Sequence, residues 1–172
     1  YNGAGKTAFL RIISGLSMPD NGSVRLTDGS DILPYSRCTM LLHKPVMLKR
    51  NVWRNIVYAQ KRGKLDNTDL EQFIQDAKIT HLLERPAREI SAGEQQRVAV
   101  LRALIKKPLI LLSDEPTGSL DEKNSDYIIE LILSLSKKNK TTSIIATHNL
   151  DIIKKLDMSF KIEKGKLIEF KK

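Results

Sequence analysis

The residues with the most evident chemistry stand at the start of the chain, in the run Asn2-Gly3-Ala4-Gly5-Lys6-Thr7. The run matches the end of the motif G-x-x-x-x-G-K-[ST], whose glycines let backbone N–H groups gather around phosphate oxygens. A helix beginning near Lys6 would aim its positive end at the same phosphates. The Lys6 ammonium suits the β- and γ-phosphates, and the Thr7 hydroxyl suits Mg²⁺. The leading Gly of the motif would precede Tyr1, so we expect the natural chain to extend further upstream.

A second chemical signal follows the apolar run 109–112, which is typical of a strand buried on both faces of a parallel sheet. Asp114 and Glu115 come just after this run, at the carboxyl edge of the sheet where ligands bind. Asp114 is therefore a candidate Mg²⁺ ligand, and Glu115 is a candidate general base that polarises an attacking water. Alone, the pair could be an ordinary acidic turn before Pro116; together with the phosphate loop it favours a magnesium–phosphate site.

The helices and strands that must position these groups alternate along the chain, which predicts an α/β fold with a mostly parallel sheet. The stretch 44–92 has few β-branched runs and several amphipathic pieces, and it predicts a helical subdomain inserted in a single domain over 1–172. The expected helices are 6–16, 93–105 and 122–135, the expected strands are 24–26, 38–42, 109–112 and 143–147, and the expected hairpin is 160–170.

Composition narrows the class of protein further. With 41% hydrophobic and 28% charged residues, the 172-residue chain suits one domain with a hydrophobic core, and disordered and collagen-like classes are excluded. No apolar run reaches the length of about 18 residues that a membrane helix needs. Cys38 is the single cysteine, which rules out an internal disulfide and favours a reducing compartment. The net charge of +9 is spread out without interleaved aromatic residues, so no nucleic-acid partner is expected.

Three further motifs lie around the acidic pair. Ser91, in the segment 90–97, is placed to cap a helix whose free N–H groups could bind an anion. Ser119-Leu120-Asp121 follows the acidic pair closely, and His148 ends the expected strand 143–147. Each motif alone has an ordinary explanation: a helix cap, a turn or a structural histidine. Beside a phosphate loop, a histidine at the carboxyl end of a strand favours contact with a γ-phosphate.

The order of these motifs along the chain resembles that in the ATPase subunits of ABC transporters: phosphate loop, helical insert, signature segment (90–97), acidic pair, D-loop (119–121) and switch histidine (His148). The resemblance covers nearly the whole chain and implies a P-loop NTPase core that binds ATP and Mg²⁺, with Lys6, Glu115 and His148 catalytic. It also implies a head-to-tail dimer in which one copy contacts the ATP of the other through five residues, Ser91, Ala92, Gly93, Glu94 and Asp121. An aromatic residue that stacks on adenine is expected upstream of Tyr1.

The resemblance further implies transmembrane permease subunits as partners, in some systems with a solute-binding protein, and a position at the cytoplasmic face of the inner membrane. The chain departs from the family pattern where His43 replaces a Gln that normally touches the metal and its water. An imidazole can also donate or accept a hydrogen bond, so His43 joins Thr7 and Asp114 as a candidate metal-site residue. Four apolar residues follow, as either a groove for a helix of the membrane subunit or part of the core: Val46, Met47, Leu48 and Trp53.

Other interpretations share parts of this pattern. A chromosome-type ABC ATPase would separate Lys6 from Ser91 by long coiled coils, and no sustained heptads intervene. A translation-type ABC protein would carry two such cassettes, and a P-loop kinase would need neither the signature segment nor His148. The base-reading motif of GTPases, N-K-x-D, is absent. The stretch 43–48 resembles importers of oxyanions such as tungstate or phosphate, whereas 114–121 resembles lipoprotein-release or macrolide exporters; we favour an importer.

Overall fold

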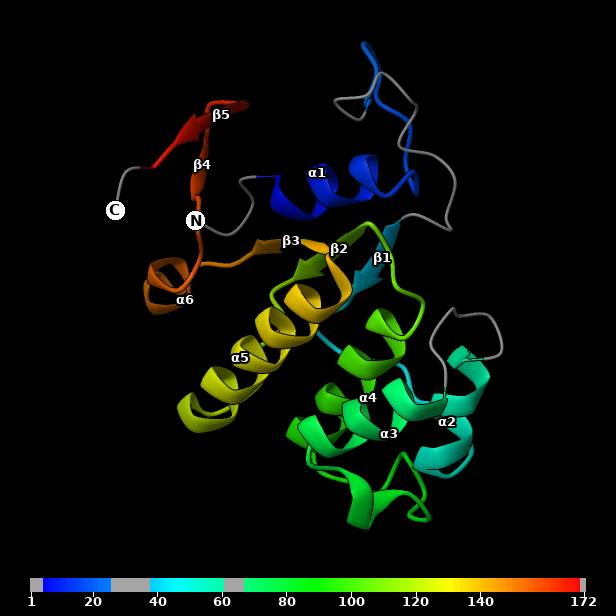
Figure 1. The fold of residues 1–172 in the computed structure, drawn as a ribbon. Helices are drawn as coiled ribbons and strands as arrows, with labels where there is room; N and C mark the ends of the chain where they lie inside the picture. Colours follow the sequence, from blue (N-terminus) through cyan, green and yellow to red (C-terminus); the bar gives the residue numbers. More distant parts are fainter. Residues whose placement is uncertain (1–4, 26–37, 61–66, 171–172) are drawn as a thin grey trace.

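Three parallel strands form the centre of the fold: β1 (Cys38–Leu41), β2 (Ile110–Asp114) and β3 (Thr142–Ala146), in the order β1-β2-β3 (Figure 1). The computed structural model describes residues 5–25, 38–60 and 67–170. Because β2 is the central strand, it pairs on both sides, with Leu111 opposite Thr39 and Ser143. Leu111 and Leu112 are fully buried, one on each face of the sheet, as the continuous apolar sequence of the strand predicts.

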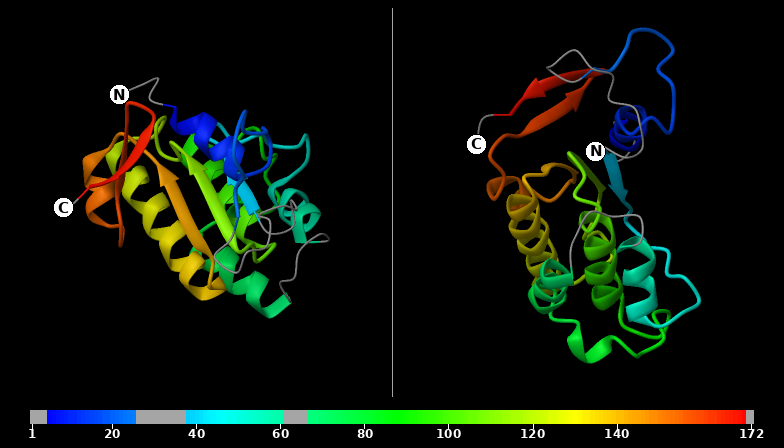
Figure 2. Two further views of the ribbon diagram at one scale, coloured as in Figure 1. Left: turned by 90° about the horizontal axis from the view of Figure 1, so that it is seen from above. Right: turned by 45° about the vertical axis from the view of Figure 1, so that its right-hand side comes forward.

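Successive side chains of β2 point to opposite faces of the sheet and enter two separate apolar clusters. On one face, Leu112 packs against Leu10 and Ile13 of α1 (Lys6–Ile13). On the other face, Leu111 joins the larger core beneath α4 (Ala92–Leu104) and α5 (Glu122–Asn139), which lie side by side (Figure 2). The sheet therefore separates α1 from α4 and α5.

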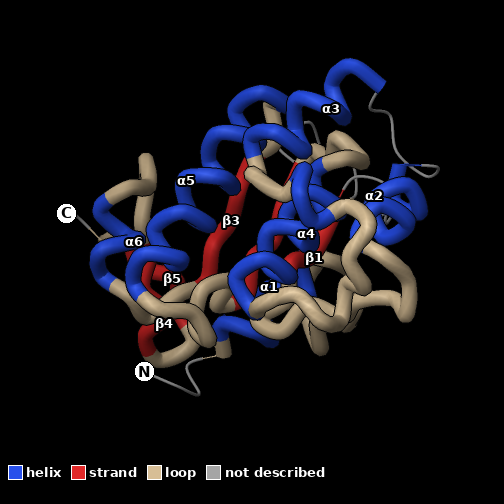
Figure 3. Tube along the Cα trace, turned by 90° about the horizontal axis from the view of Figure 1, so that it is seen from below, coloured by secondary structure: helices blue, strands red, loops and turns tan. Residues whose placement is uncertain are grey.

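The remaining elements surround this centre. Between β1 and α4 come three helices: α2 (Val52–Gln60), α3 (Asn67–Asp76) and the 3₁₀ helix η1 (Thr80–Leu82). After β3 come α6 (Leu150–Lys154) and an antiparallel hairpin of β4 (Phe160–Glu163) and β5 (Lys166–Glu169), separate from the parallel sheet. Figure 3, seen from below, shows β3 beside α5 and β1 beside α4. Buried residues of α2, α3 and α4 belong to the same larger core.

The expected α/β fold with a parallel sheet is confirmed, as are the helix beginning at Lys6 and the hairpin turning at Lys164-Gly165. Both turn residues have positive φ, 49° and 74°, which suits the twist of a tight hairpin. Strand β2 begins one residue later than expected and runs on through Asp114, because Ser113 and Asp114 pair with β3. The expected strand 24–26 extends into residues outside those described.

Several helices also differ from expectation, and α1 ends at Ile13, three residues before the end of the expected helix 6–16. Helix α5 continues past residue 135 to Asn139 and ends where Lys140 turns into the left-handed region, with φ of 55°. The short helix α6 was not expected from the sequence; Asn149 caps it by accepting a hydrogen bond from the N–H of Asp151. Within the described residues, no helix combines the length and apolar character that a bilayer crossing requires.

Candidate functional site

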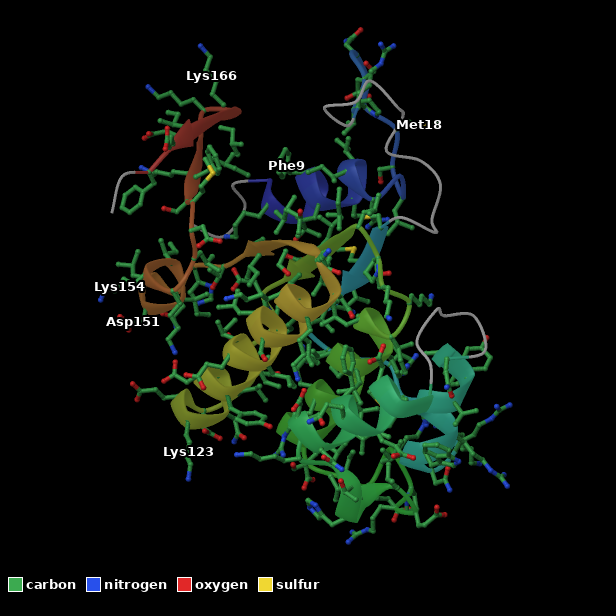
Figure 4. All side chains as sticks on the ribbon, viewed as in Figure 1. Phe9, Met18, Lys123, Asp151, Lys154 and Lys166 are labelled. Atoms are coloured by element: carbon green, nitrogen blue, oxygen red, sulfur yellow. The ribbon has the colours of Figure 1, made fainter. Side chains whose placement is uncertain are left out.

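The phosphate loop leads into α1 through Gly5, whose φ of 89° lies in the left-handed region that glycine adopts without strain. The first helical bond joins the N–H of Phe9 to the carbonyl of Gly5, and Phe9 itself lies on the side of α1 away from the sheet (Figure 4). Lys6 and Thr7 thus occupy the first turn of α1. Asn2, Gly3 and Ala4 lie outside the described residues.

The Thr7 hydroxyl meets the acidic pair directly. Its Oγ1 donates a hydrogen bond to Oδ2 of Asp114 across 2.8 Å, although the two residues are 107 positions apart in the chain. Asp114 reaches this place because it shares a face of β2 with Leu112, the face that α1 covers. Hydroxyl and carboxylate oxygens are ligands that Mg²⁺ prefers, and Mg²⁺ takes few protein ligands when phosphates and water supply the rest. The two residues fit a Mg²⁺ site.

Glu115, directly after β2, contacts residues of α1, of β3 and of the segment that follows β3. Its Oε1 lies 3.0 Å from Nδ1 of His148 and 3.6 Å from Nζ of Lys6. Its backbone is in the left-handed region, with φ of 46°, and its N–H donates to the carbonyl of Ala146 in β3. The carboxylate therefore sits between the two side chains, Lys6 and His148, that are suited to bind a negatively charged phosphate.

His43, which follows β1, contacts the main chain of the same segment. Its Nδ1 lies 3.1 Å from the main-chain carbonyl oxygen of Glu115. Its ring also lies against Gly118: a Cβ built on that glycine would be 2.9 Å from Cε1 of His43. The ring is thus packed on the turn that follows β2. A role for His43 as a metal ligand stays a prediction, and the contacts seen are with main chain.

The signature segment forms a capping box at the start of α4, as the sequence predicts for Ser91. The Ser91 hydroxyl and N–H both donate to Oε2 of Glu94, each across 2.8 Å, while the N–H of Glu94 lies 3.4 Å from the hydroxyl oxygen. Burial raises the pKa of Glu94, but the hydrogen bonds from Ser91 outweigh it, and its pKa lies below the usual value. Glu94 therefore remains ionised at neutral pH.

Asp121 caps the neighbouring helix α5, where it accepts a hydrogen bond from the N–H of Asn124. Hydrogen bonds from the Asn124 backbone and side chain hold the pKa of Asp121 below its usual value. Asn124 also touches α4, since a Cβ on Gly93 would lie 3.1 Å from its Oδ1. The starts of α4 and α5, which Ser91 and Asp121 cap, thus lie together, and both helices lie on the opposite face of the sheet from α1 (Figure 1).

A groove of about 280 Å³ lies beside β1, between α2 and α4. Leu42, Val46 and Tyr58 line it with exposed apolar surface, and Arg102 and Lys106 add positive charge on the α4 side. The Arg102 guanidinium donates to the carbonyl of Val46 across 2.8 Å. Sequence reasoning found Val46 alone among these residues, because the groove draws its lining from separate elements.

The four apolar residues after His43 therefore divide between the two roles that the sequence left open. Val46 is 71% exposed and lines the groove, whereas Met47 is buried in the core. Leu48 is half-buried, and Trp53 is partly exposed on α2. Gly118 was not singled out from the sequence either, and only the structure shows that it lies against the His43 ring.

Comparisons with known proteins agree with this geometry. The family model described as ABC transporter matches residues 1–118. The tungstate uptake system ATP-binding protein TupC of Peptoclostridium acidaminophilum is 39% identical, over 98% of this chain and 81% of that protein. The lipoprotein-releasing system ATP-binding protein LolD 2 of Chlorobaculum tepidum is 35% identical, over 96% of this chain and 75% of that protein.

A solved structure leads to the same family. That of cbiO1 from Clostridium perfringens, part of the ABC transporter complex cbiONQ, superposes with a TM-score of 0.84 at 26% identity. The likeness covers 98% of this chain and 72% of that one. The family match, the relatives above 30% identity and the shared fold together show that this chain belongs to the ABC transporter family, as one of its ATP-binding subunits.

Proposed function

We propose that this subunit hydrolyses ATP, with Mg²⁺, to drive transport through a separate membrane-spanning permease. The observation that supports this most directly is the convergence of Lys6, Thr7, Asp114, Glu115 and His148 at the carboxyl end of β2. Each of these side chains has a separate task in phosphoryl transfer. Relatives named as ATP-binding proteins of transport systems support the same activity.

The roles follow from the contacts. Lys6 holds the β- and γ-phosphates, and Thr7 and Asp114 hold Mg²⁺, which supplies charge neutralisation on the phosphate oxygens. The Glu115 carboxylate lies between Lys6 and His148. A γ-phosphate that binds the Lys6 and His148 side chains takes these two partners from Glu115, and the carboxylate is then able to accept a proton from the attacking water.

A second copy completes each ATP site in this proposal. Ser91 and Ala92 are exposed at the N-terminus of α4, whose positive dipole end attracts an anion. Because α4 lies across the sheet from α1, we propose that Ser91 and Ala92, with Asp121 beside them, bind an ATP that another copy holds. Residues 44–92 form the helical subdomain in this proposal.

Phosphate release from Mg·ATP by the purified natural protein tests the hydrolytic activity. Thr7→Ala and Asp114→Asn should raise the Mg²⁺ concentration needed for half-maximal rate, because each removes an oxygen suited to the ion. Asp69→Asn is a matched control, since Asp69 lies in α3 and pairs with Lys107 away from the site. An Asp114→Asn variant with the wild-type Mg²⁺ dependence would remove the basis of this assignment.

The groove beside β1 is the proposed docking place for a permease helix at the membrane surface. Its exposed apolar lining and its two basic residues, Arg102 and Lys106, suit an amphipathic helix that carries acidic side chains. Val46→Asp should abolish co-purification with the permease and leave basal ATP hydrolysis unchanged. Met158→Asp, at a side chain with a similar exposure of 62% outside the groove, is the control that should keep the complex.

We infer that the transporter is a prokaryotic importer of a small oxyanion, of the tungstate or phosphate class, working with a solute-binding protein. The similarity to TupC at 39% identity supports this, and the similarity to LolD 2 at 35% keeps lipoprotein release as the second candidate. Uptake of labelled tungstate and phosphate by cells with and without the gene separates the two. Unchanged uptake of both anions, with lipoproteins retained in the inner membrane, would favour the second.

A further inference from the structure

The main-chain carbonyl of Glu115 accepts two hydrogen bonds, one from the N–H of Gly118 and one from the ring of His43, each across 3.1 Å. A carbonyl oxygen can only accept, so Nδ1 of His43 must carry its hydrogen. In the neutral ring, Nε2 is then the nitrogen without a hydrogen. The contact thus selects one tautomer of His43, whereas an imidazole without such a partner is not held in either one.

The ring occupies space that only a glycine leaves open. A Cβ on Gly118 would lie 2.9 Å from Cε1 and 3.0 Å from Nδ1 of His43, closer than real Cβ contacts. Gly118 is not among the glycines with positive φ, so its backbone does not need glycine for conformational reasons. Space for the His43 ring is therefore the reason that a larger residue does not fit at position 118.

Glu115 has a backbone conformation that needs support from its neighbours. A non-glycine residue with φ of 46° is strained and persists only where surrounding contacts hold it. The N–H of Glu115 is held by the carbonyl of Ala146, and its carbonyl is held by Gly118 and His43. This conformation directs the carboxylate to Lys6 and His148.

We propose that His43 is a positioning residue for the general base: seated on Gly118, it holds the Glu115 backbone in the conformation that aims the carboxylate at the reacting phosphate. The inference rests on the proposed ATP hydrolysis, and it assigns His43 a main-chain contact in place of a bond to the metal. His43 acts through Glu115, so its loss lowers turnover and leaves nucleotide and Mg²⁺ binding in place.

Three variants of the natural protein separate this role from metal binding. His43→Asn keeps an N–H donor at the reach of Nδ1, His43→Leu fills the space without a donor, and Gly118→Ala displaces the ring. We expect kcat to fall about tenfold in His43→Leu and Gly118→Ala, as the loss of one positioning hydrogen bond predicts. His43→Asn should stay near the wild-type kcat, and KM for ATP and the Mg²⁺ dependence should not change.

The double variant His43→Leu/Gly118→Ala should be no slower than either single variant, because the two changes remove one interaction. His81→Leu, at an exposed histidine in η1, is the control for the histidine-to-leucine change itself. A shifted Mg²⁺ dependence in all His43 variants, His43→Asn included, would show a metal ligand and overturn the proposal. So would additive losses in the double variant.

A measurement without turnover keeps the inference distinct from the proposed function. In long-range ¹H–¹⁵N spectra of the nucleotide-free protein, His43 should show the tautomer with hydrogen on Nδ1, and Gly118→Ala should abolish that signature. The other tautomer in the wild-type protein would refute the contact even where the enzyme is active. An inactive wild-type protein with the expected tautomer would instead refute the proposed ATP hydrolysis.

Discussion

Replacing Glu115 with Gln should move turnover and ATP affinity in opposite directions. The change keeps the size of the side chain and removes the charge that faces Lys6 at 3.6 Å and His148 at 3.0 Å. Loss of a general base lowers the rate by about 10² to 10⁴. Affinity should rise, because Lys6 no longer has a carboxylate that competes with the γ-phosphate.

The size of the gain in affinity follows from the exposure of the pair. The side chains of Lys6 and Glu115 are 20% and 22% exposed, so solvent screens their attraction in part. At this distance the Coulomb attraction is about 1 kcal/mol in water and about 5 kcal/mol at an effective dielectric constant of 20. A net value of about 1 kcal/mol, at the upper end for partly exposed pairs, corresponds to an affinity gain of about fivefold.

The assay pairs phosphate release under saturating Mg·ATP with equilibrium titration of a fluorescent ATP analogue. Glu130→Gln is the control, because Glu130 is an exposed residue of α5 that lies near Lys155 and outside the site. Turnover within about tenfold of wild type, well short of the expected loss, would refute the general-base role. Weaker ATP binding by Glu115→Gln would refute the competition between the carboxylate and the γ-phosphate for Lys6.

Further substitutions test the packing that positions the site, each by urea-induced unfolding. Tyr127→Leu should lower the free energy of unfolding by about 2 kcal/mol, because it loses a hydrogen bond to the carbonyl of Asp76 and two cation–π contacts. Tyr127→Phe keeps the ring and loses only the hydrogen bond, so it should lower the free energy of unfolding by about 1 kcal/mol. Leu111→Ala should cost about 2–5 kcal/mol, whereas Leu109→Ala, 49% exposed, should cost under about 0.5 kcal/mol. Gly93→Ala should cost about 1 kcal/mol through overpacking against α5.

The sequence could predict the site to the extent that the chemistry lies in short runs. Lys6 and Thr7 share a motif, and Asp114 and Glu115 directly follow a buried strand, so local patterns were enough to bring them together. Parallel pairing then explains the rest, because β2 and β3 place Glu115 beside the end of β3, where His148 follows. These predictions depended on strand direction and needed no knowledge of side-chain packing.

What the sequence could not predict depends on contacts between distant residues. The close packing of the His43 ring on Gly118 joins positions in separate turns, and neither residue type alone indicates it. The φ of Glu115 was equally hidden, since most carboxylates in turns have ordinary backbone geometry. The groove was missed for the same reason: Tyr58 and Arg102 belong to different helices, and only packing of α2 against α4 places them together.

The positions of Lys6 and Ser91, the two candidate phosphate-binding groups, explain why we propose that a complete ATP site needs two copies of the chain. Lys6 belongs to α1, which covers one face of the sheet. Ser91 caps α4, which lies on the other face. The Ser91 hydroxyl already donates to Glu94, whose lowered pKa keeps it ionised. If two copies share one ATP as we propose, its γ-phosphate displaces a carboxylate at Lys6 in one copy and at Ser91 in the other. In this proposal, both exchanges replace a carboxylate by a phosphate oxygen on the same donor, Lys6 or Ser91.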